Sequence, residues 1–226
     1  MGSCCAPRSI TLGENFVREI LNDKSLKIRN YTYMELLNEV VSKRVEQEIP
    51  KEHIKKFLIP EFFDADKTDS NEIYINSIFN YILEQLDEKN NMYLVILYFY
   101  PFIRHDEEKI ADNLFNFIRF ISQSHKQEVK KDDVKNILFK YISFCTWGIT
   151  HAIQMKLVPG DDMNNSFKNL LTGTYSEENL NSFVNKIINE LTDNSDNDIV
   201  SSDKFKDVFQ KYDISTIENV RDFLFS

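Results

Sequence analysis

The sequence is poor in the residues that make turns, and this scarcity narrows the choice of fold. Among 226 residues there are only 5 glycines and 5 prolines, whereas 42% of the chain is hydrophobic and 13% is aromatic. Proteins built from many short strands, and enzymes with glycine-rich phosphate loops, need more glycine than this. The apolar content is also too high for a disordered protein. The composition therefore favours a folded, helix-rich chain.

Long apolar runs, an excess of positive charge and a cysteine framework are also missing. The longest apolar stretch, residues 92–103, is shorter than the ~20 residues of a membrane-spanning helix and contains Pro101. A net charge of -9 argues against nucleic acid as a general partner and against electrostatic binding to anionic lipid. The 3 cysteines are odd in number and two of them are adjacent, so no disulfide framework is indicated.

No motif of a nucleotide-binding loop, a zinc protease or a serine hydrolase is present. Cys145 and His151 stand six positions apart, a spacing that does not place two side chains on one helical face. We therefore expect that the protein is not an enzyme and that it needs no cofactor.

The first ten residues, MGSCCAPRSI, are typical of a lipid anchor. Removal of the initiator methionine would expose Gly2, the acceptor for N-myristoylation, although Ala6 stands where the usual pattern has serine or threonine. Cys4 and Cys5 follow at once and are predicted sites of palmitoylation. One myristoyl chain binds membranes weakly, and no polybasic segment is present to help it. We expect two acyl chains to hold the protein at the cytoplasmic face of the plasma membrane, the vacuole or another endomembrane.

From residue 11 onward the apolar residues recur at helical spacing almost throughout, which predicts an all-α fold of about ten helices. The stretch 122–133 is polar and charged and indicates a boundary between two lobes. The predicted organisation is an anchor over 1–10, an EF-hand-like helical lobe over 11–124, and a second helical lobe with a degenerate EF-hand-like loop over 125–226. We expect at most a tiny two-stranded pairing.

The segment 66–77 has the pattern of a degenerate calcium loop. An EF-hand loop supplies oxygen ligands from positions 1, 3, 5, 7 and 9, makes a sharp turn at 6, and ends with a bidentate glutamate at 12. The matching residues are Asp66 at 1, Thr68 at 3, Ser70 at 5, Asn71 at 6, Ile73 at the strand-pairing position 8, and Ser77 at 12. Asn71 is suitable at 6 because asparagine tolerates left-handed backbone. Since Ser77 cannot supply two carboxylate oxygens, calcium binding is not expected here.

A partner loop is predicted over residues 24–35. It has Glu35 at position 12 and Tyr31 at the pairing position, but its first ligand positions hold Lys24, Leu26 and Ile28. Each loop of this pair therefore lacks a different part of a calcium site. Alternatively, these segments are ordinary polar connections, which favour Asp, Asn and Ser in any case.

A third loop lies near the C-terminus, where two registers are open. One places Asp193, Ser195 and Asn197 at positions 1, 3 and 5, Val200 at 8 and Lys204 at 12. The other starts at Thr192, with Ile199 at 8 and Asp203 at 12. A lysine at 12 would oppose a cation, whereas the second register would permit weak binding of Mg²⁺ or Ca²⁺.

Several segments together resemble the N-terminal helical region of the myristoylated TLDc-domain proteins, which are linked to mTOR signalling and to the vacuolar proton pump. They are the N-terminal Met-Gly, YTYMELLNEVV, EIPKEHIKKF, INSIFNYILEQLDEKNNMYLVILYFY and EEKIADNLFNFI, over about the first 120 residues. The final segment, KFKDVFQKYDISTIENVRDFLFS, is similar to the region just before the TLDc domain, which we expect to be absent. The resemblance implies degenerate EF-hand loops and a membrane-tethered adaptor, such as a protist accessory protein of the V-ATPase.

These features favour a membrane-anchored, non-enzymatic adaptor or regulatory protein, with the V-ATPase as first candidate partner. The alternative is a myristoylated calcium sensor of EF-hand type, in which ion binding opens an apolar groove. The missing glutamate of the loop 66–77 disfavours the sensor.

Overall fold

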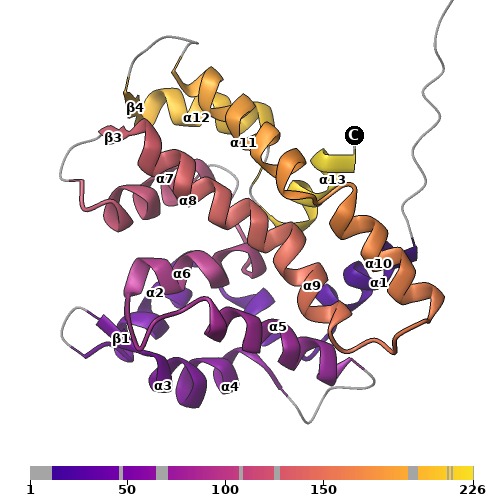
Figure 1. The fold of residues 1–226 in the computed structure, drawn as a ribbon. Helices are drawn as coiled ribbons and strands as arrows, with labels where there is room; N and C mark the ends of the chain where they lie inside the picture. Colours follow the sequence, from indigo (N-terminus) through magenta and orange to yellow (C-terminus); the bar gives the residue numbers. More distant parts are fainter. Residues whose placement is uncertain are drawn as a thin grey trace, which may run out of the picture.

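The computed structural model describes residues 12–45, 48–64, 71–106, 109–124, 128–192, 198–212, 214 and 216–225. This part of the chain is mostly helical, with two short two-stranded antiparallel sheets (Figure 1). Apart from the isolated 3₁₀ helix η1, continuous helical stretches number eleven within the described residues, against about ten predicted. The all-α prediction with minor strand pairing is therefore confirmed.

The first half of the chain forms short helices and two strands. Its elements are α1 (Leu12–Leu21), the 3₁₀ helix η1 (Lys27–Asn30), α2 (Tyr33–Ser42), β1 (Glu48–Pro50), α3 (Lys51–His53), the π-helical η2 (Ile54–Leu58), α4 (Ile59–Phe62), α5 (Glu72–Glu84), β2 (Lys89–Asn91), α6 (Met92–Phe99) and the 3₁₀ helix η4 (Tyr100–Phe102). The segments α3, η2 and α4 follow one another without a break and form a single helical stretch.

The second half also contains two helix–strand–helix segments. Its elements are α7 (Ile110–Ile121), β3 (Glu128–Lys130), α8 (Lys131–Ser143), the π-helical η5 (Phe144–Gly148), α9 (Ile149–Gln154), α10 (Asp162–Thr172), α11 (Glu177–Leu191), β4 (Ile199–Ser201), α12 (Ser202–Tyr212) and α13 (Ile217–Phe225). Here α8, η5 and α9 are continuous.

Four helix–strand–helix units, which we call hands, make up most of the fold. Hand 1 is α2–β1–α3, hand 2 is α5–β2–α6, hand 3 is α7–β3–α8 and hand 4 is α11–β4–α12. In every hand the second helix begins at the residue after the strand. Strand β1 pairs with β2, and β3 pairs with β4, both antiparallel. Two helix–loop–helix units joined through their loops are the arrangement of an EF-hand pair.

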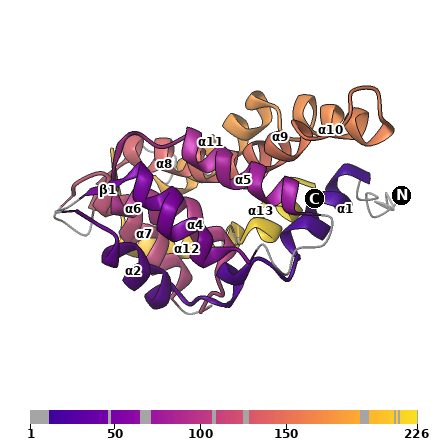
Figure 2. The same cartoon turned by 90° about the horizontal axis from the view of Figure 1, so that it is seen from below.

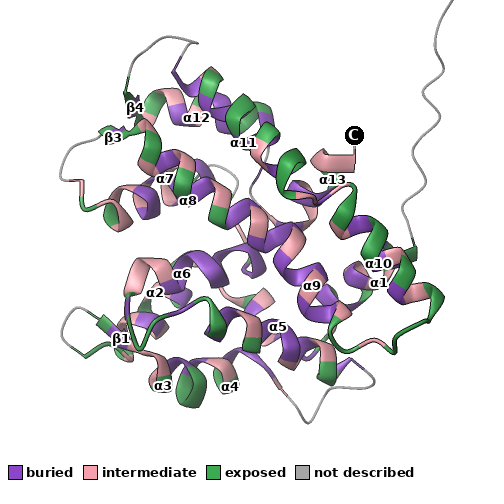
Figure 3. Cartoon of the chain, in the orientation of Figure 1, coloured by how far each residue is buried: buried purple, intermediate pink, exposed green. Residues whose placement is uncertain are grey.

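Hands 1 and 2 form the first lobe, and hands 3 and 4 form the second lobe. One continuous cluster of buried apolar residues runs through both lobes, and Figure 3 shows the buried faces of the helices turned toward one another. The boundary predicted between residues 124 and 125 falls inside hand 3, between α7 and β3. The segment from η4 to α7 connects hand 2 to hand 3.

The apolar stretch noted in the sequence forms α6 and η4, and it belongs to this core. Its residues from Val95 to Ile103 are all buried. None of the described helices combines the length and the apolar character needed to cross a bilayer.

The strands and the chain-terminal helices lie at different ends of the molecule. The two strand pairs are on the left in Figure 1, while α1, α10 and the connection from α9 to α10 are on the right. The view from below in Figure 2 shows β1 at the opposite end from α1, with α13 beside α1.

Candidate functional site

Nine of the predicted site residues lie outside the described residues. They are the lipidation sites Gly2, Cys4 and Cys5 and the loop residues Asp66, Thr68, Ser70, Asp193, Ser195 and Asn197. The remaining predicted residues are described, and the structure corrects several of their roles.

The strand pairing predicted for the loop 66–77 is wrong. Helix α5 begins at Glu72, so Ile73 and Ser77 are helical, and Ile73 is 52% exposed. Asn71 has φ -93° rather than left-handed backbone, and the Ser77 hydroxyl donates a hydrogen bond of 2.7 Å to the Ala152 carbonyl. Burial of an apolar stripe on α5 explains the early start of this helix. The stripe consists of Ile75, Ile78, Phe79 and Ile82.

The strand pairing predicted for the loop 24–35 is also wrong, because α2 begins at Tyr33. The Thr32 hydroxyl accepts from the Glu35 N–H, and the Glu35 carboxylate accepts from the Thr32 N–H at 2.7 Å. This reciprocal capping box uses the Glu35 carboxylate, which the prediction had placed at position 12 of a calcium loop. Tyr31 lies outside any strand and donates its hydroxyl to Glu61 at 2.8 Å.

Each of the two segments nevertheless bonds to a residue that flanks the other, which places them near each other. The Asp64 N–H donates to the Ser25 carbonyl at 2.9 Å, and the Asn71 amide donates to the Asp23 carboxylate at 3.0 Å. Burial acts to raise the pKa of Asp23, but hydrogen bonds from Ser25 and Asn71 outweigh it and lower the pKa. The prediction therefore placed the strands at the starts of α2 and α5, whereas the observed strands β1 and β2 follow the ends of these helices.

In hand 4 the structure decides between the two registers. Val200 is the central residue of β4 and pairs with Val129. This is the register with Lys204 at position 12, so the register with Ile199 at the pairing position is wrong. Asp203 lies in the first turn of α12, where its negative charge suits the helix N-terminus.

The central strand residues define position 12 in all four hands. With Ile49, Asn90, Val129 and Val200 at position 8, position 12 is occupied by His53, Leu94, Asp133 and Lys204. None of these is the glutamate that closes a calcium loop with two oxygens. Within the described ranges no group of three His, Cys, Asp or Glu side chains could hold a metal ion.

Protein groups close the loops of the first lobe. The ring Nδ1 of His53 lies 2.9 Å from the Lys43 carbonyl oxygen and donates to it. In hand 2 the buried Asn90 side chain accepts from the Asp87 N–H at 2.9 Å and donates to the Asp87 carbonyl at 2.6 Å. The Lys51 ammonium of hand 1 donates to Leu86 in hand 2 at 2.9 Å. Side-chain N–H groups of the protein thus bond to backbone carbonyls in the loops of both hand 1 and hand 2.

In the second lobe one hydroxyl group bonds across the loop of hand 3, and another caps the helix that follows the strand of hand 4. The Ser124 hydroxyl, at position 3 of hand 3, donates to the Glu128 carbonyl at 2.6 Å. This carbonyl is at position 7, where an EF-hand would direct it at the ion. In hand 4 the Ser201 hydroxyl accepts from the Lys204 N–H at 3.3 Å.

A buried ion pair joins the first and last described helices. The Arg221 Nε donates to Glu14 Oε1 at 2.8 Å and Nη2 donates to Oε2 at 2.6 Å, with both side chains fully buried. The Tyr175 hydroxyl also donates to Glu14, at 3.0 Å. The Arg221 guanidinium lies 4.9 Å from the centre of the Tyr175 ring. A bidentate contact of this kind fixes the relative orientation of α1 and α13.

The π-helical segment η5 and the first turn of α9 supply the remaining acceptors for this arginine. Arg221 Nη1 donates to the carbonyls of Cys145 and Thr146 at 3.0 and 3.2 Å. Its Nη2 also donates to the Thr150 hydroxyl at 3.0 Å. A π-bulge disturbs the regular helical hydrogen bonds and can leave carbonyls free for other donors. Each of the five N–H groups of the guanidinium is therefore matched by an acceptor.

Electrostatics stabilise both charges in this interior. Burial acts to raise the pKa of Glu14, but Arg221 and the hydrogen bonds outweigh it and lower the pKa. Burial likewise acts to lower the pKa of Arg221, but Tyr175 and Glu14 outweigh it and raise the pKa. Both groups therefore stay ionised at neutral pH.

Sequence reasoning missed this pair, although a signal for it exists. Glu14 lies on the buried stripe of α1 with Val17 and Leu21, and Arg221 lies on that of α13 with Ile217. An opposite charge on the apolar stripe of each of two helices indicates that the helices meet.

Cys145 and His151 do not form a catalytic pair. Cys145 is fully buried, and burial raises the pKa of its thiol well above the ordinary range. His151 is partly exposed and stacks on Trp147 with 4.5 Å between ring centres. A buried, protonated thiol is not a nucleophile.

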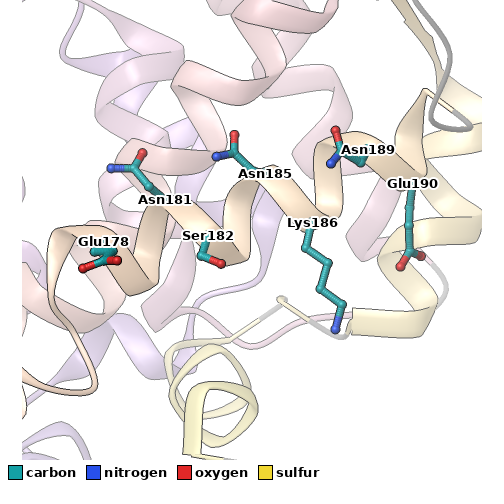
Figure 4. Close-up of a pocket in the computed structure, with 7 residues that line it drawn as sticks. All are labelled: Glu178, Asn181, Ser182, Asn185, Lys186, Asn189 and Glu190. Carbon is teal, nitrogen blue, oxygen red and sulfur yellow. The ribbon is translucent and has the colours of Figure 1, made fainter.

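A surface hollow of about 790 Å³ follows one face of α11 (Figure 4). All its lining residues come from this helix: Glu178, Asn181, Ser182, Asn185, Lys186, Asn189 and Glu190. The three asparagines point away from Lys186 and Glu190 (Figure 4). Glu190 is already paired with Lys211 at 2.8 Å. These groups do not converge on one point, and the surface is that of a solvated helix face.

A second hollow of about 500 Å³ lies between α3, α5 and α9. Three lysines and three glutamates line it, so its charge is balanced: Lys51, Lys55, Lys156, Glu52, Glu84 and Glu88. Beneath it Tyr81 approaches Gly148 so closely that a Cβ there would lie 2.7 Å from the Tyr81 ring. The glycine therefore permits the close packing of α5 on η5.

No protein-family model matches the chain, and no curated protein sequence is significantly similar to it.

Proposed function

We propose that the chain is a membrane-tethered adaptor or regulatory protein, without enzymatic activity, that binds other proteins and does not depend on calcium. One observation carries the proposal. The four hands keep the strand pairing of EF-hand pairs, while position 12 holds His53, Leu94, Asp133 and Lys204. In a calcium sensor the ion closes the loop and shifts the helices. Here protein groups make hydrogen bonds in the described parts of the loops, which supports a body that keeps its shape without an ion.

Calcium titration tests the independence from metal. A site with a Kd of ~10 μM would raise the free energy of unfolding by about 2.7 kcal/mol at ~1 mM Ca²⁺, because the ion binds only the folded state. We expect no change in urea unfolding between ~1 mM Ca²⁺ and excess chelator, and no heat of binding in calorimetry. The same titration with Mg²⁺ covers the weak binding predicted for the C-terminal loop.

The alternative, a myristoylated calcium sensor, is favoured by one residue. Asp133 is the only carboxylate at position 12 of the four described hands. A micromolar Kd that is lost in Asp133→Asn would overturn the proposal and support the sensor. Asp132→Asn, at the neighbouring position, is the matched control.

Membrane attachment is tested at Gly2 and at the adjacent cysteines. We expect Gly2→Ala to move the full-length protein from the membrane fraction to the cytosol, because myristoylation requires this glycine. The variant Cys4→Ser/Cys5→Ser should weaken attachment without abolishing it, since one acyl chain still binds reversibly. Full retention of Gly2→Ala on membranes would mean that a protein partner, and not lipid, holds the chain.

The V-ATPase is the first partner to test, and this choice rests on the resemblance to the TLDc-domain proteins. Affinity purification of the tagged protein in mild detergent should recover subunits of the pump. A tagged Gly2→Ala variant, purified in parallel, shows whether recovery depends on a shared membrane. Absence of pump subunits from the wild-type purification would remove this partner from the proposal.

A further inference from the structure

Four large apolar side chains are exposed at one end of the molecule. Leu12 is 55% exposed, Ile73 52%, Met155 67% and Val158 71%. They belong to the start of α1, the first turn of α5, and the connection from α9 to α10. Figures 1 and 2 both place these segments at the end away from the strand pairs. Large apolar residues that are exposed close together mark interaction surfaces, whereas single ones are common on any protein.

Shared surface hollows bring Ile73 and Met155 near each other. Ile73 lines a hollow with Ser77, Asn80 and Lys156, and Met155 lines the adjoining hollow with the same three residues. The connection beyond them projects from the body, because a Cβ on Gly160 would meet no atom within 4 Å. Met155 and Val158 therefore stand on a protruding segment that the protein itself does not cover.

The N-terminus determines what can cover this end. Gly2 precedes Leu12 by ten residues, and an extended chain spans at most about 3.3–3.6 Å per residue. An acyl chain on Gly2 would therefore hold the start of α1 within about 35 Å of the bilayer. The start of α1 is at the same end as the protruding connection (Figures 1 and 2).

We propose that this end of the protein rests on the bilayer, with Met155 and Val158 inserted among the lipid headgroups and acyl chains. The inference rests on the lipid anchor of the proposed function and adds the orientation of the body. Lys156 stands between the two apolar residues and can bury its stem while its ammonium reaches the headgroups. Asp161, the N-cap of α10, and Asp162, its first residue, follow and are both exposed. The segment thus carries no excess of positive charge, so its attraction is to the apolar part of the membrane and not to anionic headgroups.

Exposed apolar residues at the other end provide matched controls. Val45 is 52% exposed beside β1, and Ile199 is 46% exposed in β4. In the proposed orientation the strand pairs face away from the lipid. The same substitution at either end therefore separates membrane contact from a general effect on solubility.

Tryptophan fluorescence on vesicles tests the orientation. The full chain, myristoylated during expression, carries Trp147→Phe together with either Val158→Trp or Val45→Trp. Phosphatidylcholine vesicles with brominated acyl chains should quench the reporter at position 158 several-fold more than the reporter at position 45. Equal quenching at the two positions overturns the orientation. If the myristoylated wild-type protein does not float at about 1 mM lipid, where a single myristoyl chain is mostly bound, both the anchor and the orientation are wrong.

Vesicle partition provides a second measurement that does not depend on the reporter. We expect Met155→Asp/Val158→Asp to lower partition of the myristoylated protein by about tenfold or more, because two apolar insertions are lost. Val45→Asp/Ile199→Asp should leave partition unchanged, and circular dichroism of all variants checks folding. Unchanged partition of Met155→Asp/Val158→Asp overturns the inference while leaving the anchor intact. A loss of dimers in sedimentation, with partition unchanged, would assign the surface to a second copy of the chain.

Discussion

The two lobes share one backbone register but differ in the side chains at its centre. In the first lobe buried Ile49 faces buried Asn90, and in the second lobe buried Val129 faces buried Val200. The Asn90 amide is bonded to both backbone groups of Asp87, whereas the two valines carry no polar atoms to satisfy. Both pairs are joined by the same backbone ladder, but the Asn90 amide adds directional hydrogen bonds within the loop of hand 2, whereas Val129 and Val200 add only apolar burial.

This difference predicts unequal tolerance to substitution. Hydrogen bonds in the first lobe depend on particular donors and acceptors, and a buried group that loses its partner pays the full desolvation penalty. The apolar pair of the second lobe depends on volume, which similar residues can replace. The buried pair of Glu14 and Arg221 lies outside both hand pairs, on the helices that precede the first lobe and follow the second. The loss of unfolding free energy on breaking this pair is the reference for substitutions in the two lobes.

The largest effect is expected at that pair. Arg221→Met leaves the Glu14 carboxylate buried without its main partner, which typically costs about 3–5 kcal/mol of unfolding free energy. Urea denaturation followed by circular dichroism measures the loss. Replacing both partners, in Glu14→Leu/Arg221→Met, should recover part of the stability, because no charge is then left unpaired. Arg18→Met, which removes a partly exposed partner of Glu14, is the matched control and should cost about 1 kcal/mol or less.

Acid should weaken the same pair by a smaller amount than truncation. The folded-state pKa of Glu14 is lowered from 4.5, so its contribution is fully present above that value and is lost as pH falls through the lower, folded pKa. A protonated Glu14 still accepts hydrogen bonds from Arg221, which limits the loss. Stability measured in urea from pH 7 to pH 3 should fall more steeply in the wild type than in Glu14→Leu/Arg221→Met. Parallel curves for the two proteins would show that Glu14 does not titrate differently on unfolding.

Exchange of the central residues tests the comparison of the lobes directly. Asn90→Val gives the first lobe the apolar pairing of the second and leaves two groups of Asp87 without partners, at a cost of about 1–3 kcal/mol. The reciprocal change, Val200→Asn, introduces a buried amide next to Val129 and should cost a similar amount. Thermal and urea unfolding measure both. If Asn90→Val is as stable as the wild type, the amide bonds of the first lobe contribute nothing and the two lobes are equivalent.

The smallest effect is expected in the loop of hand 3. Ser124→Ala removes the hydroxyl that bonds the Glu128 carbonyl, and because this site is exposed, water can replace the bond. We expect a loss of about 0.5–1 kcal/mol. Calcium titration of this variant also sharpens the proposed function, since the position-7 carbonyl is then free to face an ion. A new micromolar site in Ser124→Ala would show that a single hydroxyl had blocked metal binding in the second lobe.

The helical character of the chain could be predicted from its apolar spacing, because a helix buries one stripe wherever it packs. The buried sides of α5 and α11 follow this spacing. The C-terminal loop could also be found, since one of its two registers is the one realised at Val200. Loops at 24–35 and 66–77 were recognised by composition, but composition does not say which end of a helix carries a strand.

The local sequence pattern was therefore enough to predict the helices and the polar character of the loops. The partners of those elements depended on the tertiary structure. Glu35 could complete a calcium loop or a capping box, and the start of α2 at Tyr33 decided for the cap. Glu14 and Arg221 are 207 residues apart, and no local pattern joins them. A buried charge is stable only beside its opposite, and whether two helices bring such charges together is decided by the packing of the whole chain.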